Sequence, residues 1–268
     1  MSAFEKVELS GVKNIIVVAS GKGGVGKSTV SANLAISLAR NGFETALVDA
    51  DIFGPSIPRM FGIENAQPDV THLGDKEVMF PIEKFGVKIM SVGFFIKKNQ
   101  GLIWRGPMAA NAIMQLFENT VWGDIDYMVV DFPPGTSDIQ LTTVQRLNVT
   151  GSVIVTTPQE IALNDARKAA SLFNNPDVKV PIWGIVENMA WFIPCAHPDE
   201  KYYIFGQGGG EVLANELSCK LLCQIPLVAE VGRAAENGLS IFNQNNETVI
   251  KAFEKLTEAI ATADHICS

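Results

Sequence analysis

The sequence predicts an α/β fold in which a doubly wound, mostly parallel sheet carries helices on both of its faces. Short apolar runs bounded by Gly, Pro and Asp alternate with helix-like segments, which is typical of strands buried on both faces. With 268 residues, 47% of them hydrophobic, the chain is long enough to bury the core of one such domain. We therefore expect a single domain over residues 1–268, in which residues 1–13 form an N-terminal extension.

Each predicted strand is a short apolar run, which suits a strand inside a parallel sheet. The predicted strands are 14–20, 45–50, 87–94, 127–132, 151–157, 182–187 and 221–225. Two irregular stretches, 65–84 and 193–210, interrupt this alternation and are the candidate functional loops.

The helices are predicted from apolar residues that recur at spacings of three and four. In residues 27–40, for example, Val30, Leu34 and Leu38 lie on one stripe. Further helices are expected over 108–122, 139–147, 161–173 and 210–217. The last helix is expected over 247–263 and packs on the core through Val249, Phe253, Leu256 and Ile260.

Composition limits the partners and the location of the protein. A formal net charge of -8 gives no general attraction to nucleic acid or to anionic lipid. No apolar run approaches the ~20 residues that span a bilayer, and the N-terminus does not resemble a signal peptide. The four cysteines are too few and too unevenly placed for a disulfide framework. We expect a cytoplasmic protein with reduced thiols and no nucleic-acid or membrane partner.

A phosphate-binding motif follows the first predicted strand. The chain reads Gly21, Lys22, Gly23, Gly24, Val25, Gly26, Lys27, Ser28 and Thr29, which matches G-x-x-x-x-G-K-[ST] and opens a helix. Backbone N–H groups of such a loop bind phosphate together with the helix N-terminus. We expect Lys27 to reach the β- and γ-phosphates of ATP, Ser28 to bind Mg²⁺ and Thr29 to contact the α-phosphate.

Carboxylates at two strand ends extend this predicted site. Asp131 ends an apolar strand at the edge where ligands bind in open α/β sheets, so we expect it to hold Mg²⁺, through water. Gly135, which follows two prolines, is suited to swing an amide toward the γ-phosphate. Asp49 and Asp51 end the second strand, and a carboxylate there orients the attacking water or caps a turn.

These motifs resemble a known family. Because of Lys22, the phosphate loop resembles the deviant Walker A motif of the MinD, ParA and nitrogenase-iron-protein class. Five further motifs resemble its Mrp/ApbC branch, the iron–sulfur cluster carrier ATPases: Asp-Ala-Asp-Ile-Phe-Gly-Pro-Ser at 49–56, Trp-Arg-Gly-Pro-Met at 104–108, Asp-Phe-Pro-Pro-Gly-Thr-Ser-Asp at 131–138, Thr-Pro-Gln at 157–159 and Glu-Asn-Met at 187–189. The resemblance covers nearly the whole chain.

The resemblance implies a P-loop ATPase that hydrolyses Mg-ATP slowly as a homodimer. It implies that Lys22 reaches the phosphates bound by the partner subunit and that Asp51 positions the water. Asn188 resembles the residue that reads the adenine edge in this class, although a turn-forming Asn is the ordinary alternative. Mrp-like proteins often carry a small N-terminal domain, which residues 1–13 are too short to form, as expected of a short form or a fragment.

The sequence departs from the family at the expected cluster site. Mrp-like carriers usually place Cys-Pro-x-Cys shortly after Glu-Asn-Met, but Pro194 and His197 stand at the two cysteine positions here, with Cys195 between them. Cys195 and His197 from two subunits could supply four ligands to a [4Fe–4S] cluster, or both are ordinary loop residues. Cys223 and, less strongly, Cys219 are interpreted as core residues. Cys267 is expected to be exposed near the C-terminus.

Three functions remain open from the sequence. The first is an ATP-gated iron–sulfur carrier that works with cluster donors and client apoproteins. The second is a MinD- or ParA-like partitioning ATPase, against which the net charge and the mixed charges of the C-terminal segment both count. The third is a nucleotide-regulated scaffold that holds no cluster, which the missing Cys-Pro-x-Cys keeps open.

Overall fold

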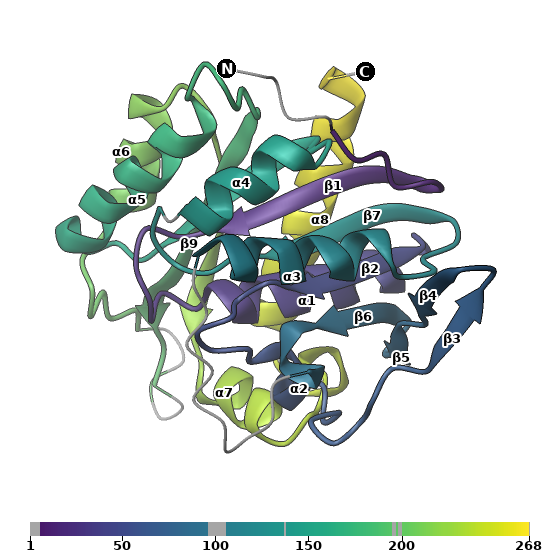
Figure 1. Cartoon of the computed structure of the whole chain (residues 1–268). Coiled ribbons are helices and arrows are strands. Elements are labelled where there is room, and N and C mark those ends of the chain that lie inside the picture. Colours follow the sequence, from purple (N-terminus) through teal and green to yellow (C-terminus); the bar gives the residue numbers. More distant parts are fainter. Residues whose placement is uncertain (1–5, 96–105, 137, 195–196, 198–199, 268) are drawn as a thin grey trace.

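The computed structural model describes residues 6–95, 106–136, 138–194, 197 and 200–267 (Figure 1). An eight-stranded sheet forms the centre, with the strand order β10-β9-β8-β1-β7-β2-β6-β5. Its strands are β1 (Val12–Ala19), β2 (Thr45–Asp49), β5 (Ile82–Lys84), β6 (Val87–Ser91), β7 (Ile125–Asp131), β8 (Gly151–Thr156), β9 (Ile182–Phe192) and β10 (Lys220–Leu227). Neighbouring strands are parallel except for the β5–β6 pair at one edge. The predicted doubly wound, mostly parallel sheet is confirmed.

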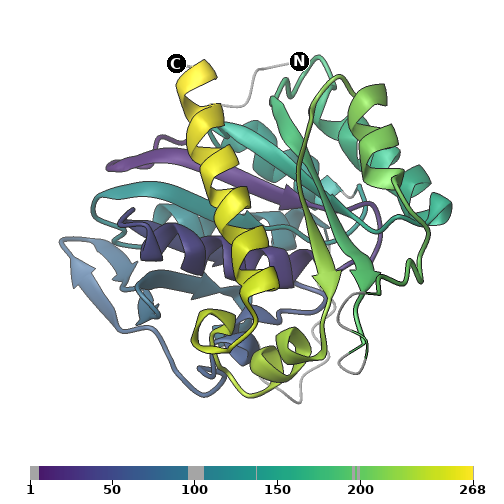
Figure 2. The same cartoon turned by 180° about the vertical axis from the view of Figure 1, so that it is seen from behind.

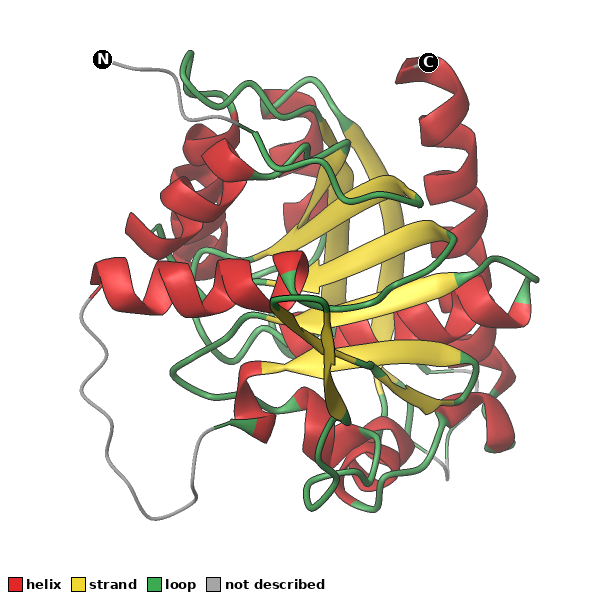
Figure 3. Cartoon of the chain, turned by 45° about the vertical axis from the view of Figure 1, so that its right-hand side comes forward, coloured by secondary structure: helices red, strands yellow, loops and turns green. Residues whose placement is uncertain are grey.

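Helices cover both faces of this sheet (Figures 1, 2 and 3). One face packs against α3 (Gly106–Glu118), α4 (Asp138–Arg146), α5 (Glu160–Phe173) and α6 (Gly209–Glu216). The other packs against α1 (Lys27–Arg40), α2 (Ile57–Met60), α7 (Ala229–Glu236) and α8 (Glu247–Cys267). Alternate residues of β1 enter the two cores, with Val17 on the α3 side and Val18 on the α1 side. The period of two therefore explains why a strand of this sheet is apolar along its whole length.

The closing helix packs as its sequence pattern predicts. Val249, Phe253, Leu256 and Ile260 are all buried, and α8 lies across α1 and β10 (Figure 2). Thr257 on the same helix donates a hydrogen bond of 2.7 Å to Ser37 of α1. None of the described helices is long and apolar enough to cross a membrane.

Several predicted boundaries were wrong. The helix expected over 108–122 ends at Glu118, because the next residues turn to pair with the hairpin: the Asn119 carbonyl accepts from the Met79 amide. The strand expected over 87–94 ends at Ser91 and continues as a 3₁₀ turn, Val92–Phe94. The strand expected over 182–187 continues to Phe192. Tertiary hydrogen bonds decide the ends at Glu118 and Phe192, whereas a local bond from the Gly93 amide to Ser91 Oγ accompanies the end at Ser91.

Two further regions contain structure that the sequence pattern did not reveal. The irregular stretch 65–84 contains a two-stranded hairpin, β3 (Val70–Leu73) and β4 (Lys76–Met79), and the edge strand β5. After β10 the chain forms α7 and a 3₁₀ turn, Ile241–Asn243, before α8. These elements are shorter than the pattern length from which a helix or strand is predicted.

Two glycines bring α2 and α7 together. Gly62 follows α2 and Gly238 follows α7, and both have left-handed backbones, with φ of 66° and 63°. A Cβ at Gly238 would lie 2.5 Å from the Gly62 Cα and 2.6 Å from its nitrogen. The contact joins backbone to backbone, so Gly238 has no room for a side chain, whereas an added Cβ at Gly62 would lie 3.3 Å from the Gly238 Cα.

We expect Gly238→Ala to lower the free energy of unfolding by roughly 2–4 kcal/mol, because it adds a backbone clash to the strain of a left-handed alanine. Gly74→Ala is the matched control, since Gly74 has φ of 64° and nothing within 4 Å of its added Cβ. The control should lose about 1 kcal/mol. Urea unfolding of both variants measures the difference. Equal losses of unfolding free energy would show that the α2–α7 contact accommodates the added Cβ without further destabilisation.

Candidate functional site

The glycine-rich loop joins the end of β1 to the start of α1, as predicted. Gly21 lies against α5 so closely that a Cβ there would be 1.9 Å from the Asp165 carbonyl carbon. Gly26, directly before α1, has φ of 83°, and its Cβ would lie 2.2 Å from the Asn188 Nδ2. Both positions therefore require glycine, one for close packing and one for backbone conformation as well.

A buried ion pair joins the first turn of α1 to the end of β7. Lys27 Nζ donates to Asp131 Oδ1 at 2.8 Å, and Ser28 Oγ donates to Asp131 Oδ2 at 2.6 Å. Ser31, one turn further along α1, also donates to Asp131 Oδ1 at 2.7 Å. Asp131 is fully buried and Lys27 is 6% exposed. The structure thus brings together three of the predicted residues, Lys27, Ser28 and Asp131.

The two aspartates at the end of β2, Asp49 and Asp51, have different environments. Asp49 is fully buried, and its carboxylate accepts from the Asp51 and Ile57 amides and from Ser91 Oγ. Burial, together with the nearby Asp131 carboxylate, raises the pKa of Asp49 to about 8, whereas the hydrogen bonds from Ser91 and the Asp51 amide act in the opposite direction. Asp49 therefore shapes the loop that follows β2.

Asp51 instead lies beside the phosphate loop. Its Oδ2 is 3.7 Å from Lys27 Nζ, and its Oδ1 accepts from the Phe53 amide at 3.2 Å. Burial raises the pKa of Asp51, and the charge of Lys27 opposes the shift. The strand-end position left both aspartates as candidates and the family resemblance indicated Asp51; of the two, only Asp51 has its carboxylate at the phosphate loop.

A cavity of about 210 Å³ lies over the loop, with Lys22, Lys27, Ser28, Thr29 and Asp51 among its lining residues. Pro134 also lines it. The amide of the next residue, Gly135, donates to the Ser20 carbonyl at 2.9 Å, so in this conformation its predicted donor is engaged within the protein.

A larger, mostly apolar cavity of about 460 Å³ adjoins the other side of the loop through Gly26 and Thr29. Residues from β9, β10, α7 and α8 complete it: Asn188, Met189, Phe192, Ile225, Pro226, Leu227, Val228, Ala229, Val231, Gly232 and Phe253. Asn188 is buried, and its Nδ2 donates to the Val25 carbonyl at 2.8 Å. Asn188 thus contacts both the loop backbone and this cavity.

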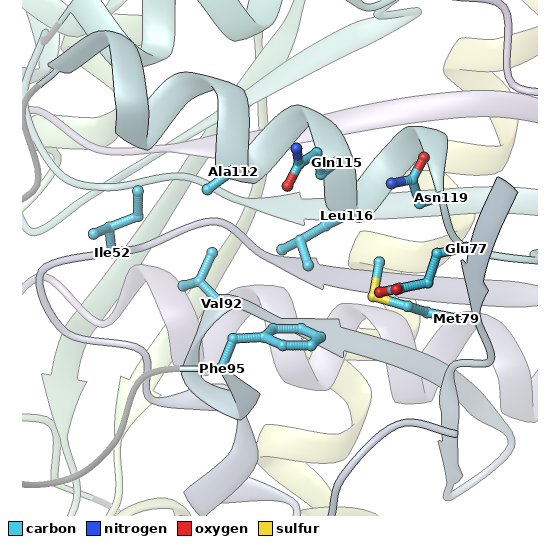
Figure 4. A pocket seen from close by; sticks show the side chains of 9 residues that line it. All are labelled: Ile52, Glu77, Met79, Val92, Phe95, Ala112, Gln115, Leu116 and Asn119. Carbon is cyan, nitrogen blue, oxygen red and sulfur yellow. The ribbon is translucent and has the colours of Figure 1, made fainter. Parts of the chain in front are cut away.

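A third cavity, of about 260 Å³, lies between α3 and the hairpin, away from the phosphate loop (Figure 4). Its apolar wall includes Val92 and Leu116, and Glu77 lies at one end. Glu77 and Met79 come from the predicted functional loop 65–84. That loop therefore lines a cavity separate from the nucleotide site.

The predicted cluster ligands are only partly placed. Cys195 lies outside the described residues. His197 is exposed, with Nδ1 3.7 Å from Glu200 Oε1. Among the described residues, no group of three or more His, Cys, Asp or Glu side chains could hold a metal ion.

The two cysteines of the described core carry free thiols. Cys223 is buried as predicted, and burial raises the pKa of its thiol to about 12. Cys219 is half-buried against the core, and burial raises its thiol pKa as well. The side chain of Cys267 is not described, so its predicted exposure stays a prediction.

Sequence reasoning missed three contributions to the site. Ser31 could have been found, because it lies one helical turn after Lys27 and faces the same carboxylate. Ser91 holds Asp49 from a neighbouring strand, and Phe192 lines the apolar cavity from the extension of β9. No local pattern signals these two, because long-range pairing brings each of them to the site.

The arrangement defines a class of protein. A glycine-rich loop follows a central parallel strand and opens a helix, and its lysine and serine contact a carboxylate on the adjacent strand β7. This is the phosphate site of a P-loop nucleotide-binding protein.

Comparison with known proteins gives the family. The family model described as the ParA: NUBPL iron-transfer P-loop NTPase matches residues 11–261, and the chain belongs to this family. An iron–sulfur cluster carrier protein of Pseudomonas fragi is 50% identical over 231 residues, which are 86% of this chain and 78% of that protein. The resemblance to iron–sulfur cluster carriers is confirmed.

Solved structures agree with the fold. A nucleotide-binding protein of Archaeoglobus fulgidus, solved in complex with ADP, has a TM-score of 0.77 at 34% identity, covering 91% of this chain and 93% of its own. The cell division ATPase MinD of Pyrococcus furiosus has a TM-score of 0.65 at 21% identity, covering 93% and 98%. The likeness to MinD concerns the fold alone.

We expect Lys27→Ala to weaken nucleotide binding at least about 100-fold, because the variant removes charge-assisted hydrogen bonds at the phosphates and leaves Asp131 without its buried cation. Lys22→Ala, in the same loop, is the control. If Lys22 acts on the partner's nucleotide, that variant should still bind nucleotide within a few-fold of the unmodified chain. Titration with a fluorescent ATP analogue measures both, and equal losses would contradict the separate roles.

Proposed function

We propose that this protein binds and slowly hydrolyses Mg-ATP as a homodimer and thereby carries iron–sulfur clusters from donors to client apoproteins. The observation that carries the proposal is the contact of Lys27 and Ser28 with Asp131, in a chain of the iron-transfer family. ATP phosphates would draw Lys27 Nζ away from Asp131 Oδ1, since the ammonium group can serve either anion. Nucleotide binding would thus exchange one ion pair for another.

The donor atoms at this position fit Mg²⁺. Ser28 Oγ and Asp131 Oδ2 are 2.6 Å apart, and hydroxyl and carboxylate oxygens are the ligands that Mg²⁺ prefers. Bound there, with Ser28 direct and Asp131 through water, Mg²⁺ would neutralise charge on the β- and γ-phosphates. Ser31 would keep Asp131 oriented, because its hydroxyl donates to the other carboxylate oxygen.

Asp51 is the residue we assign to the attacking water. Its carboxylate stands 3.7 Å from Lys27 Nζ and lines the phosphate cavity. An ionised carboxylate accepts a hydrogen bond from water and orients its lone pair toward the γ-phosphorus. The charge of Lys27 favours that ionised form against the effect of burial.

We assign the apolar cavity beside Gly26 to the adenine base. It begins at Gly26 and Thr29, where a phosphate chain leaves the loop, and its apolar walls suit a flat aromatic ring. Asn188 is the polar residue we assign to the adenine edge. The side-chain amide of Asn188 would hydrogen-bond to the base, while β9 holds Asn188 against the Val25 carbonyl.

The homodimer is proposed from the face that carries the loop. The carboxyl ends of the parallel strands all reach this edge, and large apolar side chains are exposed just beyond them, including Phe53, Ile161 and Ile204. Exposed apolar groups gathered on one face favour association. On that face Lys22 would reach the partner's phosphates and stabilise charge during transfer.

For cluster carriage, we assign Cys195 and His197 of each subunit as ligands to a [4Fe–4S] cargo. The loop that bears them follows β9, and His197 is exposed to solvent. The free thiols of Cys219 and Cys223 fit a reducing compartment such as the cytoplasm. A partitioning function is not favoured, because the MinD structures share only the fold.

Asp51→Asn should slow ATP turnover by about 100-fold or more while ATP binding changes only a few-fold, because an amide orients water less well and leaves Lys27 in place. Steady-state phosphate release and nucleotide titration measure the two quantities. Unchanged turnover would show that another residue positions the attacking water.

Anaerobic reconstitution with iron and sulfide tests cluster carriage. We expect about four irons per dimer, with matching acid-labile sulfide and visible absorption, and loss of the cluster in Cys195→Ala. Cys223→Ala is the matched control, because that buried thiol should not contribute a ligand. Active ATPase without a cluster in any of the three proteins would support the nucleotide-regulated scaffold instead.

A further inference from the structure

Phe192 takes part in two features at once. Its side chain lines the apolar cavity that we assign to the nucleobase. Its backbone forms a reciprocal pair with Tyr202: each amide donates to the other's carbonyl at 2.9 Å. This pair closes the loop 193–201, which carries Cys195 and His197. One residue therefore connects the wall of the cavity to the base of that loop.

The base of the loop is reinforced by neighbouring side chains. Lys201 Nζ lies 4.5 Å from the centre of the Trp191 ring, a cation–π contact across the same pair of segments. Tyr202 also donates a hydrogen bond from its hydroxyl to Glu200. We call Trp191, Phe192, Lys201 and Tyr202 the loop base. Its contacts make it continuous with the end of β9.

Between Asn188 and the loop base, β9 is irregular. Ile225 of β10 pairs with Asn188 and Leu227 pairs with Phe192, so Met189, Ala190 and Trp191 lie opposite Pro226 alone. Pro226 has no N–H to donate to the ladder, which explains why the pairing is interrupted there. The two extra residues of β9 form a bulge beside the cavity.

The bulge holds a strained residue. Met189 has φ of 55°, a left-handed conformation that is unfavourable for a side chain of this kind. Phe85, Lys179 and Ser218 also have positive φ in the described chain, but of these four residues only Met189 lines the apolar cavity. Backbone strain of this sort persists only where the surrounding contacts impose it. A ligand that enters the cavity therefore changes the contacts that hold Met189 in this conformation.

We propose that the β9 bulge makes Phe192 a positioning residue, through which a base in the cavity orders the loop base and the loop base in turn sets nucleotide affinity. The inference rests on the proposed nucleotide function and concerns its regulation. A purine ring would contact Met189 and Phe192 and restrict the bulge. By linkage, the factor by which a bound base favours the ordered loop base equals the factor by which the ordered loop base raises the affinity for the base.

Hydrogen exchange with two ligands tests the coupling in the full chain. Saturating Mg-ADP fills both cavities, whereas Mg-tripolyphosphate fills the phosphate loop and has no base. We expect ADP to slow exchange at the Phe192 and Tyr202 amides about fivefold or more. Tripolyphosphate should protect the phosphate loop and leave these two amides unchanged. Equal protection by both ligands would overturn the proposal, because the loop base would then follow the phosphates through Asn188.

Two variants locate the coupling. Phe192→Ala and Met189→Gly should each weaken ADP binding, because both residues line the cavity. At ADP concentrations that saturate each variant, the phosphate loop should be protected and the ADP effect at Tyr202 should be lost. Lys179→Gly is the matched control, since it removes a left-handed side chain at an exposed site outside the cavity, and it should keep the full effect. A Tyr202 response that survives both cavity variants would contradict the role of Phe192.

The same data separate this inference from the proposed function. If ADP protects neither the phosphate loop nor the loop base, the proposal that this protein binds nucleotide is wrong. If ADP protects the phosphate loop but not Tyr202, only the coupling through Phe192 is wrong.

Discussion

The buried contact of Lys27 with Asp131 is the interaction on which the rest of the site depends. A buried carboxylate without a cation is strongly destabilising, so in this conformation the pair holds the first turn of α1 against the end of β7. The sheet makes this possible, because the register pairs Val18 of β1 and Asp49 of β2 with Asp131. Three adjacent parallel strands thus deliver the loop, the Asp131 carboxylate and the Asp49–Asp51 turn to one edge.

The buried polar residues of β9 support the opposite side of the site. Asn188 binds the Val25 carbonyl, and the fully buried Glu187 beside it accepts from the Gly210 amide and from Gln224. The phosphate loop, the start of α6 and β10 are therefore all tied to two consecutive residues. The bulge that follows them is the place where this strand stops being regular, next to the apolar cavity.

The two cavities differ in their lining side chains, as the phosphate end of a nucleotide differs in polarity from its base. The smaller one is lined by lysines, hydroxyls and a carboxylate, and the larger one mainly by aliphatic and aromatic side chains. Gly26 and Thr29 line both, so a single ligand can span them. The same edge exposes apolar side chains and leads into the loop of Cys195, so the proposed nucleotide, partner subunit and cargo would share one face.

The sequence by itself determined the parallel strands of the sheet, α1 and the phosphate loop, because local periodicity and the motif from Gly21 to Thr29 act over a few neighbouring residues. It also identified Asp131 by its place at a strand end. Strand position alone could not separate Asp49 from Asp51, and only the family resemblance indicated Asp51. Packing supplies the physical difference, because Ser91 occupies one carboxylate while Lys27 approaches the other. The sequence also could not reveal the extension of β9 to Phe192. That feature depends on pairing with β10 and Tyr202, and contacts between distant segments leave no local pattern.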